Sequence, residues 1–114
     1  FVPLTAEIMQ ALEFIETCIE SGNELRLEDV ADRLHLSLSY FKMRFTREIG
    51  ISPWKYICKR RVEIAQNLLC DGRSITDVSY ELHYSSTQHF STSFKAFTGL
   101  SPHEWLMNSQ PNRT

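Results

Sequence analysis

The 114-residue chain has the length of one compact domain, or of two very small units that share a core. Its hydrophobic fraction of 42% is ordinary for a globular protein, and its net charge of −2 predicts no class of partner by itself. No apolar run reaches the length of a membrane span, and no signal-peptide pattern opens the sequence. The cysteines Cys18, Cys58 and Cys70 are odd in number and far apart, so we expect reduced thiols rather than disulfides or a zinc site.

Apolar residues at three- and four-residue spacing predict helices along the whole chain, and no strand is predicted. The predicted helices cover residues 5–21, 27–34, 38–49, 53–70, 74–82, 86–97 and 102–107. Ser37 is expected to cap the third of them and Gly50 to end it, and Ser52-Pro53 is expected to begin the fourth. Short connections predict an all-α fold, and residues 109–114 are expected to form a flexible tail.

One phrase occurs twice, as GISPWKYI at residues 50–57 and as GLSPHEWL at residues 99–106, 49 positions apart. The repeat extends upstream, with one extra residue in the turn of the second copy. Its matched pairs are Phe41 and Phe90, Phe45 and Phe94, then, at an offset of 48, Val30 and Val78, Leu34 and Leu82, and Ser37 and Ser85. Each copy is therefore a short helix, a tight turn and a second helix. This is the layout of a helix-turn-helix, and the duplication suggests two equivalent surfaces.

The charge is strongly asymmetric along the chain. Residues 1–34 carry two basic and eight acidic side chains, and residues 42–61 carry seven basic and one acidic. The basic stretch covers the second helix of the first copy and the start of the linking helix, where a phosphate backbone would run. The linking helix, at 18 residues, would be about 27 Å long, close to the roughly 34 Å between major-groove segments on one face of DNA.

These features resemble the DNA-binding domain of AraC/XylS-type bacterial transcription regulators. The resemblance covers residues 25–106 and depends on the two helix-turn-helix units, the two G-x-S-P phrases, Phe-x-x-x-Phe in each second helix, and Arg61-x-x-x-Ala65-x-x-Leu68-Leu69. It implies an all-α fold in which two helix-turn-helix subdomains, residues 1–52 and 73–108, are joined by a long central helix at 53–72. It also implies a regulator, usually an activator, that binds asymmetric promoter sites and contacts RNA polymerase. Dimerisation would use a separate domain, and the start at Phe1 fits a C-terminal fragment.

The sequence departs from the family pattern at two places. The second turn, usually Gly-Phe, is His83-Tyr84, and we expect His83 to keep the left-handed backbone at some energetic cost. A slot that often holds arginine in each second helix holds Met43 and Thr92. We therefore expect no arginine–guanine contact from these two positions.

Helical geometry separates core from contact surface. The residues expected to face inward are Phe41, Phe45, Ile49, Phe90, Phe94 and Phe97, together with Trp54 and Trp105. By the resemblance, base contacts fall on Ser39, Lys42, Met43, Gln88, His89 and Thr92. Tyr40 joins this face, although partial burial is an alternative for Tyr40 and Met43. Arg47, Arg60 and Lys95 are expected to contact phosphates. Arg61 is expected either to hold two helices together or to touch DNA.

No histidine has an acid or nucleophile partner at a telling spacing, so the sequence predicts neither an enzyme nor a cofactor or metal site. The expected partner is double-stranded promoter DNA in the cytoplasm of a bacterium. The competing hypothesis is a protein-interaction module that uses an acidic first helix. Its acidic residues are Glu7, Glu13, Glu16, Glu20 and Glu24.

Overall fold

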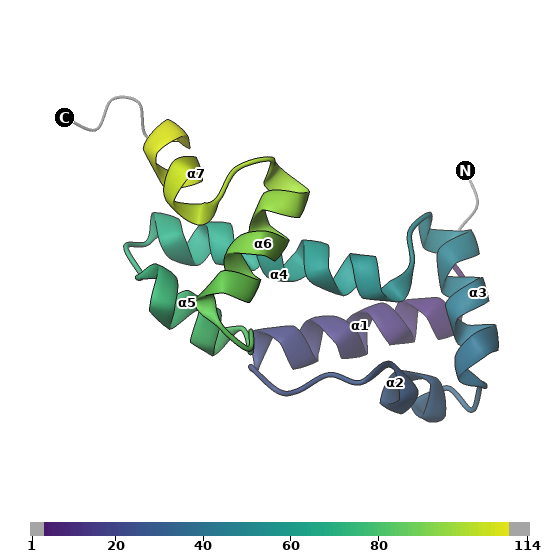
Figure 1. Cartoon of the computed structure of the whole chain (residues 1–114). Coiled ribbons are helices and arrows are strands. Elements are labelled where there is room, and N and C mark those ends of the chain that lie inside the picture. Colours follow the sequence, from purple (N-terminus) through teal and green to yellow (C-terminus); the bar gives the residue numbers. More distant parts are fainter. Residues whose placement is uncertain (1–3, 110–114) are drawn as a thin grey trace. The chain divides into compact units, whose positions relative to one another are not determined.

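The computed structural model describes residues 4–109, and these contain seven α-helices and no strand (Figure 1). The helices are α1 (Ala6–Glu20), α2 (Leu27–Arg33), α3 (Leu38–Ile49), α4 (Pro53–Cys70), α5 (Ile75–Glu81), α6 (Thr87–Thr98) and α7 (Pro102–Ser109). This confirms the all-α prediction, and each helix end lies within two residues of the predicted one. The tail predicted over 109–114 lies outside the described residues, apart from Ser109, which ends α7.

The chain divides into two compact units, residues 1–57 and 58–114, with the division inside α4. In the first unit α1, α2 and α3 contact one another, and in the second unit α6 contacts both α5 and α7 (Figure 1). Each unit therefore contains one helix-turn-helix pair, α2 with α3 and α5 with α6. Along the described chain, no helix is both long and apolar enough to cross a membrane.

The turns of the two helix-turn-helix pairs have the same backbone conformation and hydrogen bonds. His35 and His83 adopt left-handed φ values of 58° and 63°. In each turn the next residue donates its N–H back across the helix end, from Leu36 to Ala31 at 3.0 Å and from Tyr84 to Ser79 at 3.0 Å. This is the Schellman motif. The expectation that His83 keeps the left-handed turn is confirmed, and the first copy uses histidine in the same way.

The extra residue of the second turn changes one predicted equivalence. Ser37 caps α3 by accepting the N–H of Tyr40 at 3.2 Å. The corresponding cap of α6 is Ser86, which accepts the N–H of His89 at 3.0 Å. The pairing of Ser37 with Ser85 was therefore wrong by one residue, because the insertion falls between the left-handed residue and the cap.

The repeated G-x-S-P phrase ends one helix and begins the next in both copies. Gly50 and Gly99 have φ values of 99° and 85°, a left-handed region that side chains other than glycine rarely adopt. Ser101 and Glu104 exchange hydrogen bonds at the start of α7, forming a capping box. The backbone N–H of Ser101 lowers the pKa of Glu104. In the first copy Ser52 caps α4 by accepting the N–H of Lys55 at 3.2 Å.

The predicted phenylalanine core is present in both copies. Phe41, Phe45, Phe90 and Phe94 are fully buried. In the second unit Phe90 and Phe94 belong to a cluster with apolar residues of α4, of α5 and of the C-cap of α5, namely Val62, Ala65, Leu69, Val78 and Leu82. Ile49 is partly buried.

Two core assignments were wrong. Phe97 is 42% exposed, because Thr98, the repeat equivalent of Ile49, takes the more buried position at the end of α6. Trp54 is 55% exposed, whereas Trp105 packs edge-on against Phe94 with ring centroids 5.7 Å apart. The first-unit equivalent of Trp105 is Tyr56, whose ring lies 5.6 Å from that of Phe45.

Candidate nucleic-acid interface

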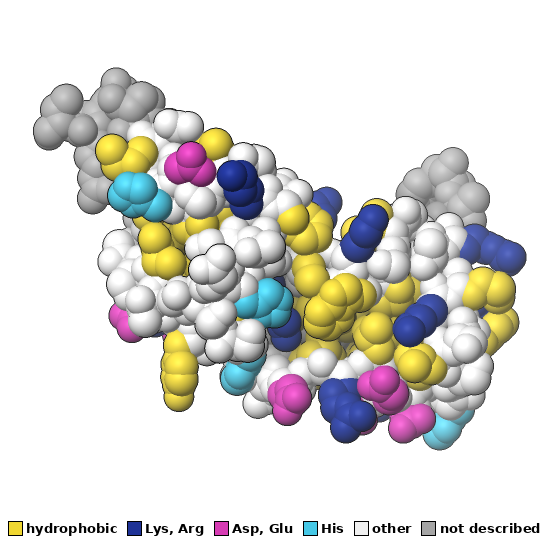
Figure 2. Space-filling model, viewed as in Figure 1, with side chains coloured by type: hydrophobic (Ala, Val, Ile, Leu, Met, Phe, Trp, Pro, Cys, Tyr) yellow, Lys and Arg dark blue, Asp and Glu magenta, His cyan; other side chains and the backbone are white. Residues whose placement is uncertain are grey.

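The outer face of α3 carries the residues predicted to touch DNA in the first unit. Because Phe41 and Phe45 are buried, the helical period turns the opposite side of α3 to solvent. Tyr40 and Met43 are 46% and 47% exposed, so each is partly covered by the protein and partly accessible to a partner. Ser39, Lys42 and Arg47 are also exposed. Hydrophobic and basic side chains gather together over α3 in the space-filling view (Figure 2).

Arg44 lies on the same helix but does not join this face. Its side chain is only 15% exposed, and its guanidinium donates to Glu7 at 3.0 Å, to Thr5 at 2.7 Å and to Glu48 at 3.4 Å. The hydrogen bond to Glu7 raises the pKa of Arg44, and the backbone N–H of Thr5 lowers the pKa of Glu48. Although Arg44 belongs to the basic stretch of the chain, Glu7 and Glu48 pair with its charge, so it is not free to contact DNA in this arrangement.

The equivalent face of α6 in the second unit is polar and carries little charge. Gln88, His89, Thr92 and Lys95 are all exposed. The Thr92 hydroxyl donates to the carbonyl of Gln88 at 3.0 Å, so its methyl group is the part left for an apolar contact. The imidazole of His89 lies between Ser85, whose hydroxyl is 3.1 Å from Nδ1, and the ring of Tyr84, with centroids 5.6 Å apart.

Tyr84 and Cys58 in the second unit are partly buried polar groups near Arg61. Burial raises the pKa of the Tyr84 hydroxyl and of the Cys58 thiol, and the positive charge of Arg61 partly opposes both shifts. Both pKa shifts favour the neutral form of the group. Arg60 pairs with Glu63 at 2.7 Å, three residues along α4, and its side chain is 30% exposed.

Trp54 is an exposed aromatic residue, although it was predicted to lie in the core. The repeat itself contained the signal, since an offset of 49 aligns Trp105 with Tyr56 and Trp54 with the exposed His103. Trp54 precedes Lys55 in the first turn of α4, in the basic stretch of the chain. Another exposed aromatic residue, Tyr80 on α5, is 84% exposed and was not singled out by its sequence context.

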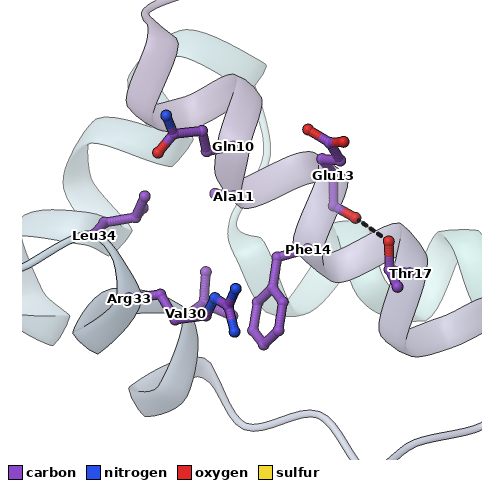
Figure 3. A pocket seen from close by; sticks show the side chains of 8 residues that line it. All are labelled: Gln10, Ala11, Glu13, Phe14, Thr17, Val30, Arg33 and Leu34. Carbon is purple, nitrogen blue, oxygen red and sulfur yellow. Dashed lines mark hydrogen bonds between the residues drawn. The ribbon is translucent and has the colours of Figure 1, made fainter.

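A groove of about 390 Å³ lies between α1 and α2, apart from the predicted contact residues (Figure 3). Its floor includes Ala11 and Val30, and Arg33 from α2 stacks over the ring of Phe14 from α1 at 4.5 Å. This cation–π contact joins α1 to α2. Among the described residues, no group of three or more His, Cys, Asp or Glu side chains is placed to hold a metal.

Paired helices with left-handed turns, and an exposed second helix in each pair, define a protein with two helix-turn-helix units. The family model described as "Helix-turn-helix domain" matches residues 30–108. The chain belongs to the AraC-type helix-turn-helix family and is a DNA-binding domain of the kind found in transcription regulators. This membership confirms the predicted family and shows that the domain is not an enzyme.

Individual relatives agree with this assignment. The chain is 31% identical to the HTH-type transcriptional activator RhaS of Escherichia coli over 84 residues. These aligned residues make up 73% of this chain and 30% of RhaS. It is similar to the C-terminal domain of AraT, a response regulator from Geobacillus stearothermophilus, with a TM-score of 0.85, 29% identity, and 94% and 88% of the two chains covered.

The DNA-binding domain of the global transcriptional factor AdpA, solved in complex with a target DNA, shares the fold. Its TM-score is 0.82, with 22% identity and 96% and 97% of the two chains covered. The chain spans only between 11% and 36% of the length of the curated relatives that it matches first. It therefore corresponds to one part of those regulators.

Proposed function

We propose that this domain binds an asymmetric site in double-stranded promoter DNA, with α3 and α6 each entering the major groove. The observation that carries the proposal is the match between the two helix pairs. Each has a left-handed histidine turn, a serine cap, a buried Phe pair and an outer face of exposed polar side chains. The AdpA domain, which has this fold, was solved with its target DNA.

The proposed asymmetry comes from the differences between the two copies. They follow one another along a single chain and differ in sequence, so they need not read the same base sequence. The two outer faces also differ in chemistry, since α3 presents Lys42 and Arg47 whereas α6 presents mainly Gln88, His89 and Thr92. We expect the first copy to supply more of the salt-dependent affinity and the second to add selectivity.

The predicted base contacts follow from side-chain chemistry. Gln88 can grip adenine through two hydrogen bonds, and Lys42 can donate to guanine. Met43 and the methyl group of Thr92 can pack against thymine methyl groups. Arg47, Arg60 and Lys95 are proposed to contact phosphates, and Ser39, Tyr40 and His89 complete the two faces.

The whole regulator, of which this domain would be one part, is proposed to act as an activator in the bacterial cytoplasm. RhaS, a relative at 31% identity, is a transcriptional activator. An activator of this kind would contact RNA polymerase, and dimerisation would use a different domain.

The structure weakens the alternative of an acidic interaction surface on α1. Glu7 is paired with Arg44 at 3.0 Å, and Glu16 accepts a hydrogen bond from the Tyr56 hydroxyl at 3.1 Å. Two of the five acidic residues proposed for that surface therefore serve the packing of the first unit.

Electrophoretic mobility shifts at increasing salt test the proposal. The 114-residue chain should bind DNA, and log K should fall linearly with log salt, as counterion release requires. Arg33→Ala is the matched control for Arg47→Ala, since it removes the same charge from a side chain that already stacks on Phe14. No binding at low salt, or equal losses in both variants, would contradict the proposed interface.

A further inference from the structure

The N-terminus of α1 is fastened to α3 by a compact ionic network in the first unit. Glu48 accepts the backbone N–H of Thr5 at 2.8 Å and the Thr5 hydroxyl at 3.1 Å. The backbone N–H of an N-cap threonine often donates to a Glu or Gln side chain three residues later, but that position of α1 is Ile8. Glu48 on α3 supplies the missing acceptor, so the start of α1 depends on the recognition helix.

Arg44 connects this network to the proposed DNA-contact face. Tyr40, Arg44 and Glu48 are spaced four residues apart along α3, which places them on one stripe. The Arg44 guanidinium lies 5.7 Å from the centroid of the Tyr40 ring, within the range of a cation–π contact. The same guanidinium donates to Glu7, Thr5 and Glu48. The ring of Tyr40 is therefore in contact with a side chain that is hydrogen-bonded to α1 and to its N-cap.

The equivalent position of α6 also carries an aromatic ring that neighbouring side chains contact. His89 is the repeat equivalent of Tyr40, and each is the third residue of its helix after the serine cap. In the second copy the residue equivalent to Arg44 is Ser93. There the imidazole is held by Ser85, the extra residue of the turn, and by the ring of Tyr84. In each copy, therefore, a different set of side chains contacts the ring at this position.

We propose that Arg44 is a positioning residue for DNA recognition, which orients Tyr40 on behalf of α1 and does not itself contact phosphate. The proposal rests on the proposed function and adds α1 to the recognition apparatus. It reverses the simplest interpretation of the sequence, in which an arginine in a basic recognition helix binds the DNA backbone. The geometry supports positioning because the guanidinium donates to three side chains at once and the Arg44 side chain as a whole is only 15% exposed.

The two roles predict opposite results for Arg44→Lys. Lysine keeps the positive charge but lacks the planar fork that serves several acceptors at once. A phosphate contact would tolerate the change, and the affinity and its salt dependence would stay the same. A positioning residue would not tolerate it. We expect roughly tenfold weaker binding to the preferred site, comparable to losing one good base contact. Affinity for random DNA and the salt slope should not change.

The test uses the 114-residue chain and a DNA site that this chain selects from a random library. The base preference lost in Arg44→Lys should be the one lost in Tyr40→Leu, and Arg44→Lys should add no further loss in the Tyr40→Leu background. Arg44→Lys binding like the parent, or shifting preference at unrelated base pairs, would overturn the proposal. A parent chain that selects no site would instead overturn the proposed function.

Glu7→Gln is a milder variant that keeps the test decisive if Arg44→Lys does not fold. Arg44 then retains Glu48 and Thr5 as partners. We expect a smaller loss of preference at the same base pair as in Tyr40→Leu. If Arg44 served only as a charge near DNA, removing the neighbouring carboxylate would tighten binding to all sequences alike and leave the preference unchanged. That result would contradict the positioning role.

Discussion

Two phenylalanines of α6 provide a sharp test of the core. Phe94 is fully buried, with ring centroids 5.7 Å from Phe90 and 5.7 Å from Trp105, whereas Phe97 is 42% exposed. Truncating a fully buried Phe to Ala costs about 3–5 kcal/mol, because the apolar transfer energy is lost and a cavity remains. Full burial of such a side chain stabilises by roughly 1.5–3 kcal/mol, so the partly exposed Phe97 should cost only about 1 kcal/mol.

Urea unfolding followed by the fluorescence of Trp105 measures both variants. Trp105 touches Phe94 in the second unit, and replacing the exposed Trp54 with Phe leaves Trp105 as the single tryptophan. Both variants remove the same atoms from one helix, so any difference between them reports burial. Phe94→Ala should therefore lower the free energy of unfolding several times more than Phe97→Ala. Equal losses would show that the second unit does not pack as described, and that the repeat does not place the core.

Three further predictions concern the proposed interface and the α1–α3 network. Arg47→Ala should weaken binding to all DNA sequences and lower the salt slope by about one, which mobility shifts on specific and random DNA would measure. A changed base preference would contradict the assignment of Arg47 to phosphate. Gln88→Ala should cost about 1–3 kcal/mol on the preferred site and relax the preference at one base pair, as measured by repeated site selection. Equal losses on random DNA would contradict that role. Glu48 has a pKa below its ordinary value of 4.5 because it accepts the Thr5 N–H, so its stabilising contribution is complete at neutral pH and is lost as the pH falls through the depressed value. Glu48→Gln should therefore lower the melting temperature at pH 7 and have little effect at acidic pH. The control Glu20→Gln, at an exposed position, should have little effect on the melting temperature at either pH. A decrease for Glu48→Gln that is the same at both pH values would contradict the role of the Glu48 charge.

The sequence predicted the helices and most of the core because their signals are local. Gly50, the capping serines and the spacing of Phe41 and Phe45 each act within one or two helical turns. The left-handed His83 could also be predicted, because the repeat required a turn at that position.

The errors have a common physical origin in contacts between distant residues. Arg44 is 37 positions from Glu7 and 39 from Thr5, so the basic stretch gave no sign that this arginine is neutralised. Trp54 was assigned to the core because of its hydrophobicity, although the repeat aligned Tyr56, and not Trp54, with the partly buried Trp105. The exposed positions of Ser39, Lys42 and Gln88 followed from periodicity, but which bases they contact remains a prediction.

The most direct test of the central proposal is hydroxyl-radical footprinting of the 114-residue chain on a site that it selects from random DNA. We expect two protected segments on one face of the duplex, about 10–10.5 base pairs apart, with different base sequences in the two segments. Each segment would correspond to one recognition helix, α3 or α6. A single protected segment, or two segments related by a palindrome and occupied by two copies of the chain, would contradict the proposed asymmetric site.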